Sequence, residues 1–393
     1  IHAAVPALSI QQVLALVGRA LFFRFLVDRG IVTAADLPNI TRRVKDISEV
    51  FGTLEALVDT CKWLDKIFNG DLLSFCEDDS HDAPHEYTAL ERLLSARSTD
   101  VCWNLTNIQA KALRGQLPLE WSGIYFKHVP VDVLSQVYED FAHEFVPALA
   151  KATSIHFTPR KLAEIVVDGA FSAVNSAPPD QALVLDPSVG GGVFLVLSFK
   201  RLVAERWRAT GERPQRAEIR RILMTQLTGL DVNRDALNVT ALSLYLCALE
   251  LDPDPSPLSD LKFQKLIGAI LHPVDFAALD PNNVPGDSLD DADLGSLSDQ
   301  VVFGPLNNTF DIVVGNPPWS AFKDGRKNAL NLTLRKLLAR RLEPATPPAA
   351  AMVARYGSPD IAFVFAASLW AKAGGAIGFA VHGRILFQPE SFE

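Results

Sequence analysis

From about residue 130 onward, short apolar runs alternate with longer stretches of helical character. The runs are Ala182–Leu185, Gln226–Leu230, Phe310–Val314 and Ala376–Val381. Because helices that alternate with strands connect parallel neighbours, this pattern predicts an α/β domain with a mostly parallel sheet. Ligands of such sheets bind at the carboxyl ends of the strands. The residues that follow these runs are therefore the candidates for a functional site.

Residues 1–128 lack this alternation and instead carry apolar residues at helical spacing, most densely in Ile10–Val27 and Val50–Phe68. We therefore expect two domains, an all-helical one at 1–128 and the α/β domain at 129–393. His81 and His85 lie in an acidic segment with no helix to place both rings on one face. We predict a solvated loop there and no metal site.

Charge and cysteine usage limit what the chain can bind and where it works. Lys plus Arg total 37 against 46 Asp plus Glu, a formal net charge of −9, so nucleic-acid binding would need a local basic patch. The four cysteines form no CxxC pair, which predicts reduced thiols in a cytoplasmic protein. Lys372 and Gly374-Gly375 interrupt the apolar stretch Ile361–Val381. We expect a helix, a glycine turn and a strand there, and no membrane span.

The stretch Leu183–Leu195 reads LVLDPSVGGGVFL and predicts a strand, a tight loop and a helix. The strand is expected to end at Asp186 and the helix to begin near Val193, with three glycines between them. Glycines let the backbone approach a ligand closely, and a helix N-terminus favours polar or anionic groups. A glycine loop also occurs in plain β–α turns, so this motif alone indicates a ligand loop without naming the ligand.

A second strand is expected to end in an acid at Asp231, within Leu227–Ala236 (LTGLDVNRDA). In a doubly wound sheet the acid after the second strand commonly hydrogen-bonds ribose hydroxyls, about 20 residues beyond the glycine loop. The charged stretch Lys200–Arg221 lengthens that spacing, and we interpret it as an inserted, solvated helix. The competing interpretation is an acid that caps the next helix.

The segment Phe310–Phe322, FDIVVGNPPWSAF, is the most specific motif. Pro317 and Pro318 fix φ and remove two backbone donors, which leaves carbonyl acceptors in a stiff loop. Asn316 adds an amide oxygen and Trp319 a flat aromatic face. Acceptors beside an aromatic platform suit a planar molecule with an exocyclic amino group. A rigid turn with a packing tryptophan is the alternative, and GNPPW after an apolar strand favours the binding interpretation.

These motifs, in this order, resemble motifs I, II and IV of the amino-group DNA methyltransferases, and NPP before an aromatic resembles the adenine-N6 enzymes. Val131–Phe141 and His156–Val166 resemble the Tyr-Glu helix and motif X, and Gly286–Leu289 stands where motif III belongs. Motif X ahead of motif I is the γ-class order. The likeness covers roughly 131–393. The helical start resembles the region before the methylase core of large restriction-modification and phage-defence methylases.

The resemblance implies a Rossmann-like, S-adenosylmethionine-dependent methyltransferase core in the second domain, with no metal. It implies that Asp186 faces the cofactor's amino group, that Asp231 bonds the ribose hydroxyls and that Val232 packs on the adenine ring. Asp287 would accept from the adenine amino group. The remaining cofactor positions implied are Thr158, Pro159, Pro187, Gly190, Gly192, Phe194 and Asn316.

The resemblance also implies the reaction, site-specific methylation of adenine N6 in DNA. The target base would be flipped out of the duplex and stacked on Trp319. The Asn316 side-chain oxygen and the Pro317 carbonyl, in the loop that Pro318 stiffens, would accept the two N6 hydrogens. Transfer would be direct, without a covalent enzyme intermediate. We expect DNA-backbone contacts from the basic segment after this loop, with a solvated helix face as the alternative, at Lys323, Arg326, Lys327, Arg335 and Lys336.

Several alternatives stay open. NPP-aromatic motifs also occur in enzymes that methylate RNA bases or protein glutamine, and an inactive cofactor-binding scaffold is another class. The nearest nuclease-like constellation, Asp254 with Asp260 and Lys262, is too compact. In the γ order the target-recognition domain follows motif VIII, near His382–Leu386, so we expect a fragment that lacks it, binds the cofactor and methylates DNA weakly or not at all by itself. A nuclease or recognition region would belong to a longer parent chain or a partner subunit, and a role in restriction or phage defence rests on analogy.

Overall fold

A computed structural model describes residues 10–51, 53–68, 158–254, 262–274, 295–319, 324–341 and 358–383. The chain divides into two compact units, Ile1–Val133 with Asp254–Lys265, and Leu134–Pro253 with Leu266–Glu393. The expected domain boundary at 128/129 lies outside the described residues and stays a prediction. No helix within the described ranges is long and apolar enough to cross a membrane.

The described part of the first unit is helical, as the apolar spacing predicts. Arg19 is buried, and its guanidinium pairs with Asp65 at 2.8 Å. Phe23 meets the rings of Phe51 and Trp63 edge-on. The segment around His81 and His85 lies outside the described residues. The elements are α1 (Ile10–Asp28), η1 (Ala34–Asp36), α2 (Leu37–Ile40), η2 (Ile47–Glu49) and α3 (Leu54–Phe68).

A five-stranded sheet organises the second unit and confirms the predicted fold class. Every pair of neighbours in it is parallel, in the order β3-β2-β1-β4-β5. Because β1 lies between β2 and β4, the carboxyl ends of the three motif-bearing strands are adjacent. The apolar pattern did not predict β3. The strands are β1 (Val184–Asp186), β2 (Leu227–Asp231), β3 (Leu271–Pro273), β4 (Phe310–Gly315) and β5 (Ala371–Phe379).

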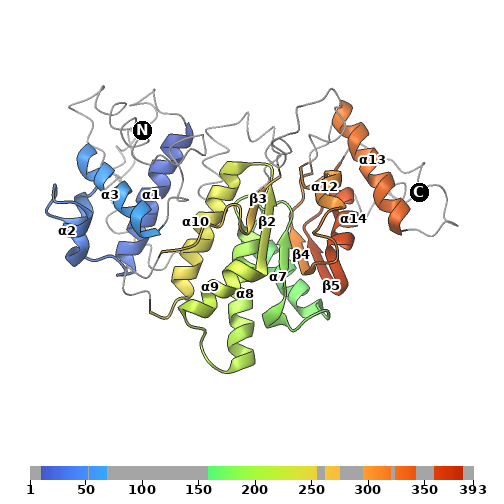
Figure 1. The fold of residues 1–393 in the computed structure, drawn as a ribbon, viewed down its shortest axis with the longest axis horizontal. Helices are drawn as coiled ribbons and strands as arrows, with labels where there is room; N and C mark the ends of the chain where they lie inside the picture. Colours follow the sequence, from blue (N-terminus) through green and yellow to red (C-terminus); the bar gives the residue numbers. More distant parts are fainter. Residues whose placement is uncertain are drawn as a thin grey trace, which may run out of the picture. The chain divides into compact units, whose positions relative to one another are not determined.

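Helices cover both faces of this sheet (Figure 1). One group consists of α7 (Arg160–Ala173), α8 (Val193–Thr210) and α10 (Arg234–Leu251), with α9 (Arg216–Gln226) beside α8 and α10. The other consists of α12 (Asp299–Val302), α13 (Asp324–Arg341) and α14 (Asp360–Trp370). Their apolar side chains bury Leu185, Leu230 and Val313 of the sheet together with Phe363 and Trp370 of α14. Burial of every residue of β1 and β4 explains why these strands read as continuous apolar runs, whereas most of β5 is half-buried or exposed.

The expected glycine turn before the last strand is wrong. Strand β5 begins at Ala371, directly after α14, and Gly374-Gly375 lies inside it. Between paired positions β4 advances from Phe310 to Ile312 while β5 advances from Ala371 to Ala376, so the extra residues form an irregularity within the strand. Gly374 adopts a φ of +79°, which favours glycine. The glycines therefore bend the strand and do not end it.

Asp311 joins β4, β1 and β5 at the amino end of the sheet. Its carboxylate is 1% exposed and accepts hydrogen bonds from Leu183 N at 2.9 Å, Ser176 Oγ at 2.7 Å and Lys372 Nζ at 3.0 Å. Burial by itself would raise the pKa of Asp311, but these hydrogen bonds and the Lys372 charge hold it below its usual value. This end of the sheet is opposite the predicted site, so Asp311 is a structural residue.

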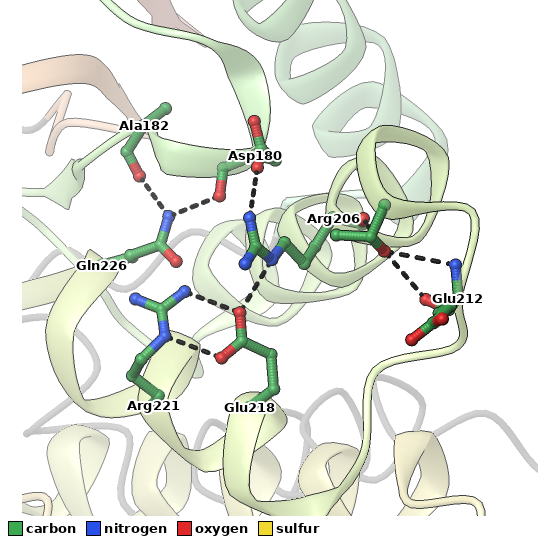
Figure 2. A network of polar contacts seen from close by, with 8 residues as sticks. Asp180, Ala182, Arg206, Glu212, Glu218, Arg221 and Gln226 are labelled. Carbon is green, nitrogen blue, oxygen red and sulfur yellow. Dashed lines mark hydrogen bonds and ion pairs between the residues drawn. The ribbon is translucent and has the colours of Figure 1, made fainter.

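The charged stretch Lys200–Arg221 forms an ion-paired surface between α8 and α9. Figure 2 shows Arg206 between the carboxylates of Asp180 and Glu218, at 3.1 Å and 2.8 Å. Arg221 meets Glu218 through two nitrogens, and the hydrogen bond from Arg221 is the main reason that the pKa of Glu218 is lowered. Gln226 donates to the carbonyls of Asp180 and Ala182. The expectation of one inserted helix is therefore wrong: Lys200–Arg221 comprises the end of α8, a connection and the start of α9, and α9 contacts the chain before β1 through Gln226.

Candidate active site

The three sequence motifs meet at one edge of the sheet, at the carboxyl ends of β2, β1 and β4. Asp231 ends β2, Asp186 ends β1 and Gly315 ends β4. The ends of β1 and β4 pack closely: a Cβ built on Gly315 would lie 2.7 Å from Oδ1 of Asp186. The glycine of GNPPW is thus required by the acid of the glycine-loop strand. This is the position at which a doubly wound sheet binds its ligand.

Asp186 is completely buried at this edge. Its Oδ1 accepts from Ser188 N at 3.0 Å, while its Oδ2 has no hydrogen-bond partner among the described residues. Burial is the main cause that raises the pKa of Asp186 to about 8; the hydrogen bond from Ser188 opposes this shift and the charge of Asp231 adds to it. A buried acceptor atom without a donor costs free energy in the ligand-free protein. A cationic donor such as an ammonium group would satisfy it.

The glycine loop runs from Asp186 to the start of α8 at Val193, where the sequence places the helix. Gly190 and Gly192 adopt φ values of +52° and +88°, so both use the conformational freedom of glycine. A hydrogen bond from a distant residue holds the start of the loop: the Pro187 carbonyl accepts from the buried Ser296 Oγ at 2.5 Å. Phe194, predicted as a support, is buried in the first turn of α8.

Asp231 contacts the loop directly. Its Oδ2 accepts from Gly190 N at 2.8 Å and its Oδ1 from Asn233 N at 2.7 Å. Burial raises the pKa of Asp231, while these backbone hydrogen bonds favour its charged form. The side chain of the next residue, Val232, is 54% exposed, which is unusual for a valine beside a core strand. The hydrogen bond from Asn233 N agrees in part with the alternative that Asp231 caps the next helix. The hydrogen bond from Gly190 N, however, joins Asp231 to the glycine loop.

Motif X and motif IV residues also meet. Asn316 Nδ2 donates to Thr158 Oγ1 at 2.8 Å, although the two residues are 158 positions apart. Thr158 is 5% exposed and Pro159 begins the turn into α7. The contact orients the Asn316 amide, with its nitrogen toward Thr158 and its oxygen on the other side of the planar group.

Trp319 is held beside the end of β5. Its indole Nε1 donates to the Ala380 carbonyl at 3.3 Å, and its ring meets His382 edge-on at 5.7 Å. Pro317 is buried and Pro318 half-buried between Asn316 and Trp319. The proline pair therefore links an anchored amide to an anchored aromatic ring.

The basic segment forms α13, which begins five residues after Trp319. Its apolar side Leu330, Leu334 and Leu337 packs in the core. Arg335 is exposed and Lys327 and Lys336 are half-buried. Lys323 and Asp287 lie outside the described residues, as does the side chain of Arg326.

Sequence reasoning missed three residues that shape the site. Thr240 and Ser296 donate to loop carbonyls from distant elements, and Gly229 allows close packing, since a Cβ on it would lie 2.5 Å from Val189 Cγ2. No motif indicates the two hydroxyls. Of the three residues, only Gly229 could have been found from the sequence, because a glycine inside the strand motif LTGLD indicates close packing. Among the described residues no group of three or more His, Cys, Asp or Glu side chains could hold a metal ion.

Two protein-family models match this region. N-6 DNA Methylase matches residues 130–261, which include Thr158, Asp186 and Asp231. Eco57I restriction-modification methylase matches residues 225–386, which include Asn316 and Trp319. Among curated proteins, none matches the chain.

Solved structures with likeness to the chain are distant in sequence. The DrdV–DNA complex is 12% identical over 97% of this chain and 37% of that chain, with a TM-score of 0.46. The ATP-dependent Type ISP restriction-modification enzyme LlaBIII bound to DNA is 14% identical over 96% and 24%, also at 0.46. A type I restriction-modification methyltransferase subunit from Streptococcus thermophilus is 14% identical over 99% and 74%, at 0.43. The chain thus spans 37% and 24% of the first two proteins.

Proposed function

We propose that the chain transfers a methyl group from S-adenosylmethionine to N6 of a flipped-out adenine in DNA, on the premise that residues 130–386 match the N-6 DNA Methylase and Eco57I restriction-modification methylase models. The observation that carries the proposal is the junction of β1 and β4, where the GNPPW loop starts against the carboxylate of Asp186. A base-binding loop and a cofactor loop that share one edge suit direct transfer between two bound molecules.

The described residues fit the cofactor. The Asp186 Oδ2 atom is buried and has no hydrogen-bond partner among the described residues, so it suits the ammonium group of the cofactor. The positive charge of that group would lower the raised pKa of Asp186 and favour its ionised form. Asp231 would accept from the ribose hydroxyls and the exposed Val232 would pack on the adenine ring. When bound, S-adenosylmethionine supplies an electrophilic methyl group on its sulfonium. The supporting positions are Thr158, Pro159, Pro187, Gly190, Gly192, Phe194 and, outside the described residues, Asp287.

The residues after β4 would bind the target base. The Asn316 oxygen and the Pro317 carbonyl would accept the two N6 hydrogens, which localises the nitrogen lone pair for attack. The hydrogen bond from Asn316 Nδ2 to Thr158 supports this role because it directs the amide oxygen away from Thr158. Trp319 would stack on the base, and the hydrogen bond from its indole N–H to the Ala380 carbonyl fixes the orientation of the ring.

DNA would reach this site past α13. Arg335, Lys327 and Lys336 lie on its surface, and phosphate contacts need no base-specific geometry. We propose these three, together with Lys323 and Arg326, as backbone contacts. The proposed partners are duplex DNA and a target-recognition or nuclease region of a longer chain or second subunit. A restriction-modification or phage-defence system is the proposed setting.

The reaction is tested with methyl-labelled S-adenosylmethionine and duplex DNA, using the full-length protein. Mass spectrometry of the digested nucleosides should find label in N6-methyladenine. Asn316→Ala should lose that product, whereas Asn175→Ala, an exposed residue at the opposite end of the sheet beside Gly374, should keep it. Label in cytosine, in RNA or in protein glutamine, or full activity of Asn316→Ala, would contradict the proposal.

A further inference from the structure

The glycine loop holds a backbone conformation that needs support. Gly190 and Gly192 both have positive φ, two positions apart, in a segment of six residues between β1 and α8. Glycine adopts positive and negative φ about equally well, so the sequence alone does not select this conformation over others. The contacts that fix this loop therefore decide how it meets a ligand.

Gly190 is fixed through both of its backbone polar groups. Its N–H donates to Asp231 Oδ2 at 2.8 Å, and its carbonyl accepts from Thr240 Oγ1 at 2.9 Å. Asp231 is already a predicted ligand residue, whereas no motif singles out Thr240. Thr240 lies on α10, 50 residues further along the chain, and is fully buried. Its hydroxyl is thus placed under the loop by the packing of α10.

Thr240 also sets the space available to the loop. A Cβ built on Gly192 would lie 2.8 Å from both Thr240 Cγ2 and Oγ1, so the side chain is in direct contact with the second left-handed glycine. One side chain therefore contacts both residues that carry the unusual φ angles. The hydroxyl holds the carbonyl of Gly190, and the methyl limits how far Gly192 can move toward α10.

The hydrogen bond fixes a peptide plane. In a trans peptide the carbonyl and the next N–H point in opposite directions. When the Gly190 carbonyl points at Thr240 on α10, the Gly191 N–H is directed to the opposite side of the loop. Rotation of this peptide would reverse both groups and break the contact with Thr240, so the hydroxyl selects one of the two orientations.

We propose that Thr240 is a positioning residue for the cofactor: its hydroxyl orients the Gly190–Gly191 peptide so that the loop is ready for the carboxylate end of S-adenosylmethionine. The inference rests on the proposed function and assigns a role to a residue outside every motif. Thr240 acts through the loop, without a contact of its own to the cofactor. The methyl and the hydroxyl contribute separately, and two substitutions separate them.

The test is calorimetric titration of the chain with S-adenosylmethionine. Thr240→Val keeps the shape and removes the hydroxyl, and it should weaken binding about tenfold, as expected for one lost buried hydrogen bond. Thr240→Ser keeps the hydroxyl and should bind within about threefold of wild type. Ser243→Ala is the matched control, because Ser243 is buried on the same helix and donates to Val239, away from the loop.

The outcomes separate this inference from the proposed function. Wild-type protein that does not bind would overturn the proposed function itself. Wild-type binding with Thr240→Val equally tight, or with Ser243→Ala equally weakened, would overturn the role of Thr240. Thermal unfolding without ligand is measured for all variants, since a merely structural hydroxyl would lower the melting temperature and leave the affinity unchanged. Should Thr240→Val fail to fold, Thr240→Ala takes its place, because it leaves space without crowding the carbonyl.

Discussion

Gly315→Ala tests whether the base-binding loop and the cofactor acid are mechanically joined. Gly315 has no positive φ, so its backbone accepts alanine. The new methyl group would stand 2.7 Å from Asp186 Oδ1. An ordinary C···O contact is about 3.3 Å, so the carboxylate would have to retreat by about 0.6 Å. That movement would disturb the hydrogen bond from Ser188 N.

Two effects of this substitution should be measurable. Overpacking should lower the free energy of unfolding by about 1–3 kcal/mol in a urea titration. Because the displaced group is the proposed ammonium partner, the affinity for S-adenosylmethionine should fall at least about tenfold in calorimetry. Gly315→Ala, a substitution in the GNPPW motif proposed to bind the target base, would then weaken binding of the cofactor.

Gly375→Ala is the control for crowding alone. Its Cβ would lie 2.9 Å from the Lys372 carbonyl and 3.0 Å from the Asp311 carbonyl, at the opposite end of the sheet. It should destabilise the protein by a similar amount and leave the cofactor affinity unchanged. The reasoning is refuted if Gly315→Ala destabilises the protein but binds S-adenosylmethionine as tightly as wild type.

Three further predictions concern buried acids and the aromatic platform. Because hydrogen bonds lower the pKa of Asp311, its contribution to stability is present above the ordinary value of about 4 and is lost as pH falls through the lower folded value. Asp311→Asn should therefore cost about 2–3 kcal/mol at pH 7 and flatten the acid limb of urea unfolding measured from pH 3 to 7; an unchanged limb would contradict this. Burial raises the pKa of Asp186 to about 8, so the ligand-free protein should lose stability as pH rises from about 4 toward that value. Asp186→Asn should remove this loss, and an identical pH dependence in wild type and variant would count against it. Trp319→Ala should retain the cofactor in calorimetry and lose about 1–3 kcal/mol of base binding in a fluorescence titration with DNA containing 2-aminopurine at the target position; unaltered base binding would remove Trp319 from the site.

The strands and loops that bear the motifs could be predicted because their signals are local. The end of β1 at Asp186, the start of α8 at Val193 and the end of β2 at Asp231 all agree with the sequence. Each depends on an apolar run followed by glycine or an acid, within a few residues. The order of the strands then brings the motifs together without further information.

The parts that could not be predicted depend on contacts between distant residues. Thr240 and Ser296 are ordinary helix and turn residues until the fold places their hydroxyls under the glycine loop. The course of β5 was misread because Gly374-Gly375 is a turn signal that the register with β4 overrides. Sequence motifs thus located the groups proposed to meet the ligands, and only the structure located the residues that hold those groups in place.

The most direct test of the central claim is whether the purified chain binds S-adenosylmethionine through Asp231. Calorimetric titration should give saturable binding at one site per chain for the wild type. Asp231→Ala should abolish binding, since it removes the carboxylate that accepts from Gly190 N and is proposed to accept from the ribose hydroxyls. Asp168→Ala, on the exposed side of α7, should leave binding unchanged. Absence of saturable binding by the wild type, or undiminished binding by Asp231→Ala, would contradict the account.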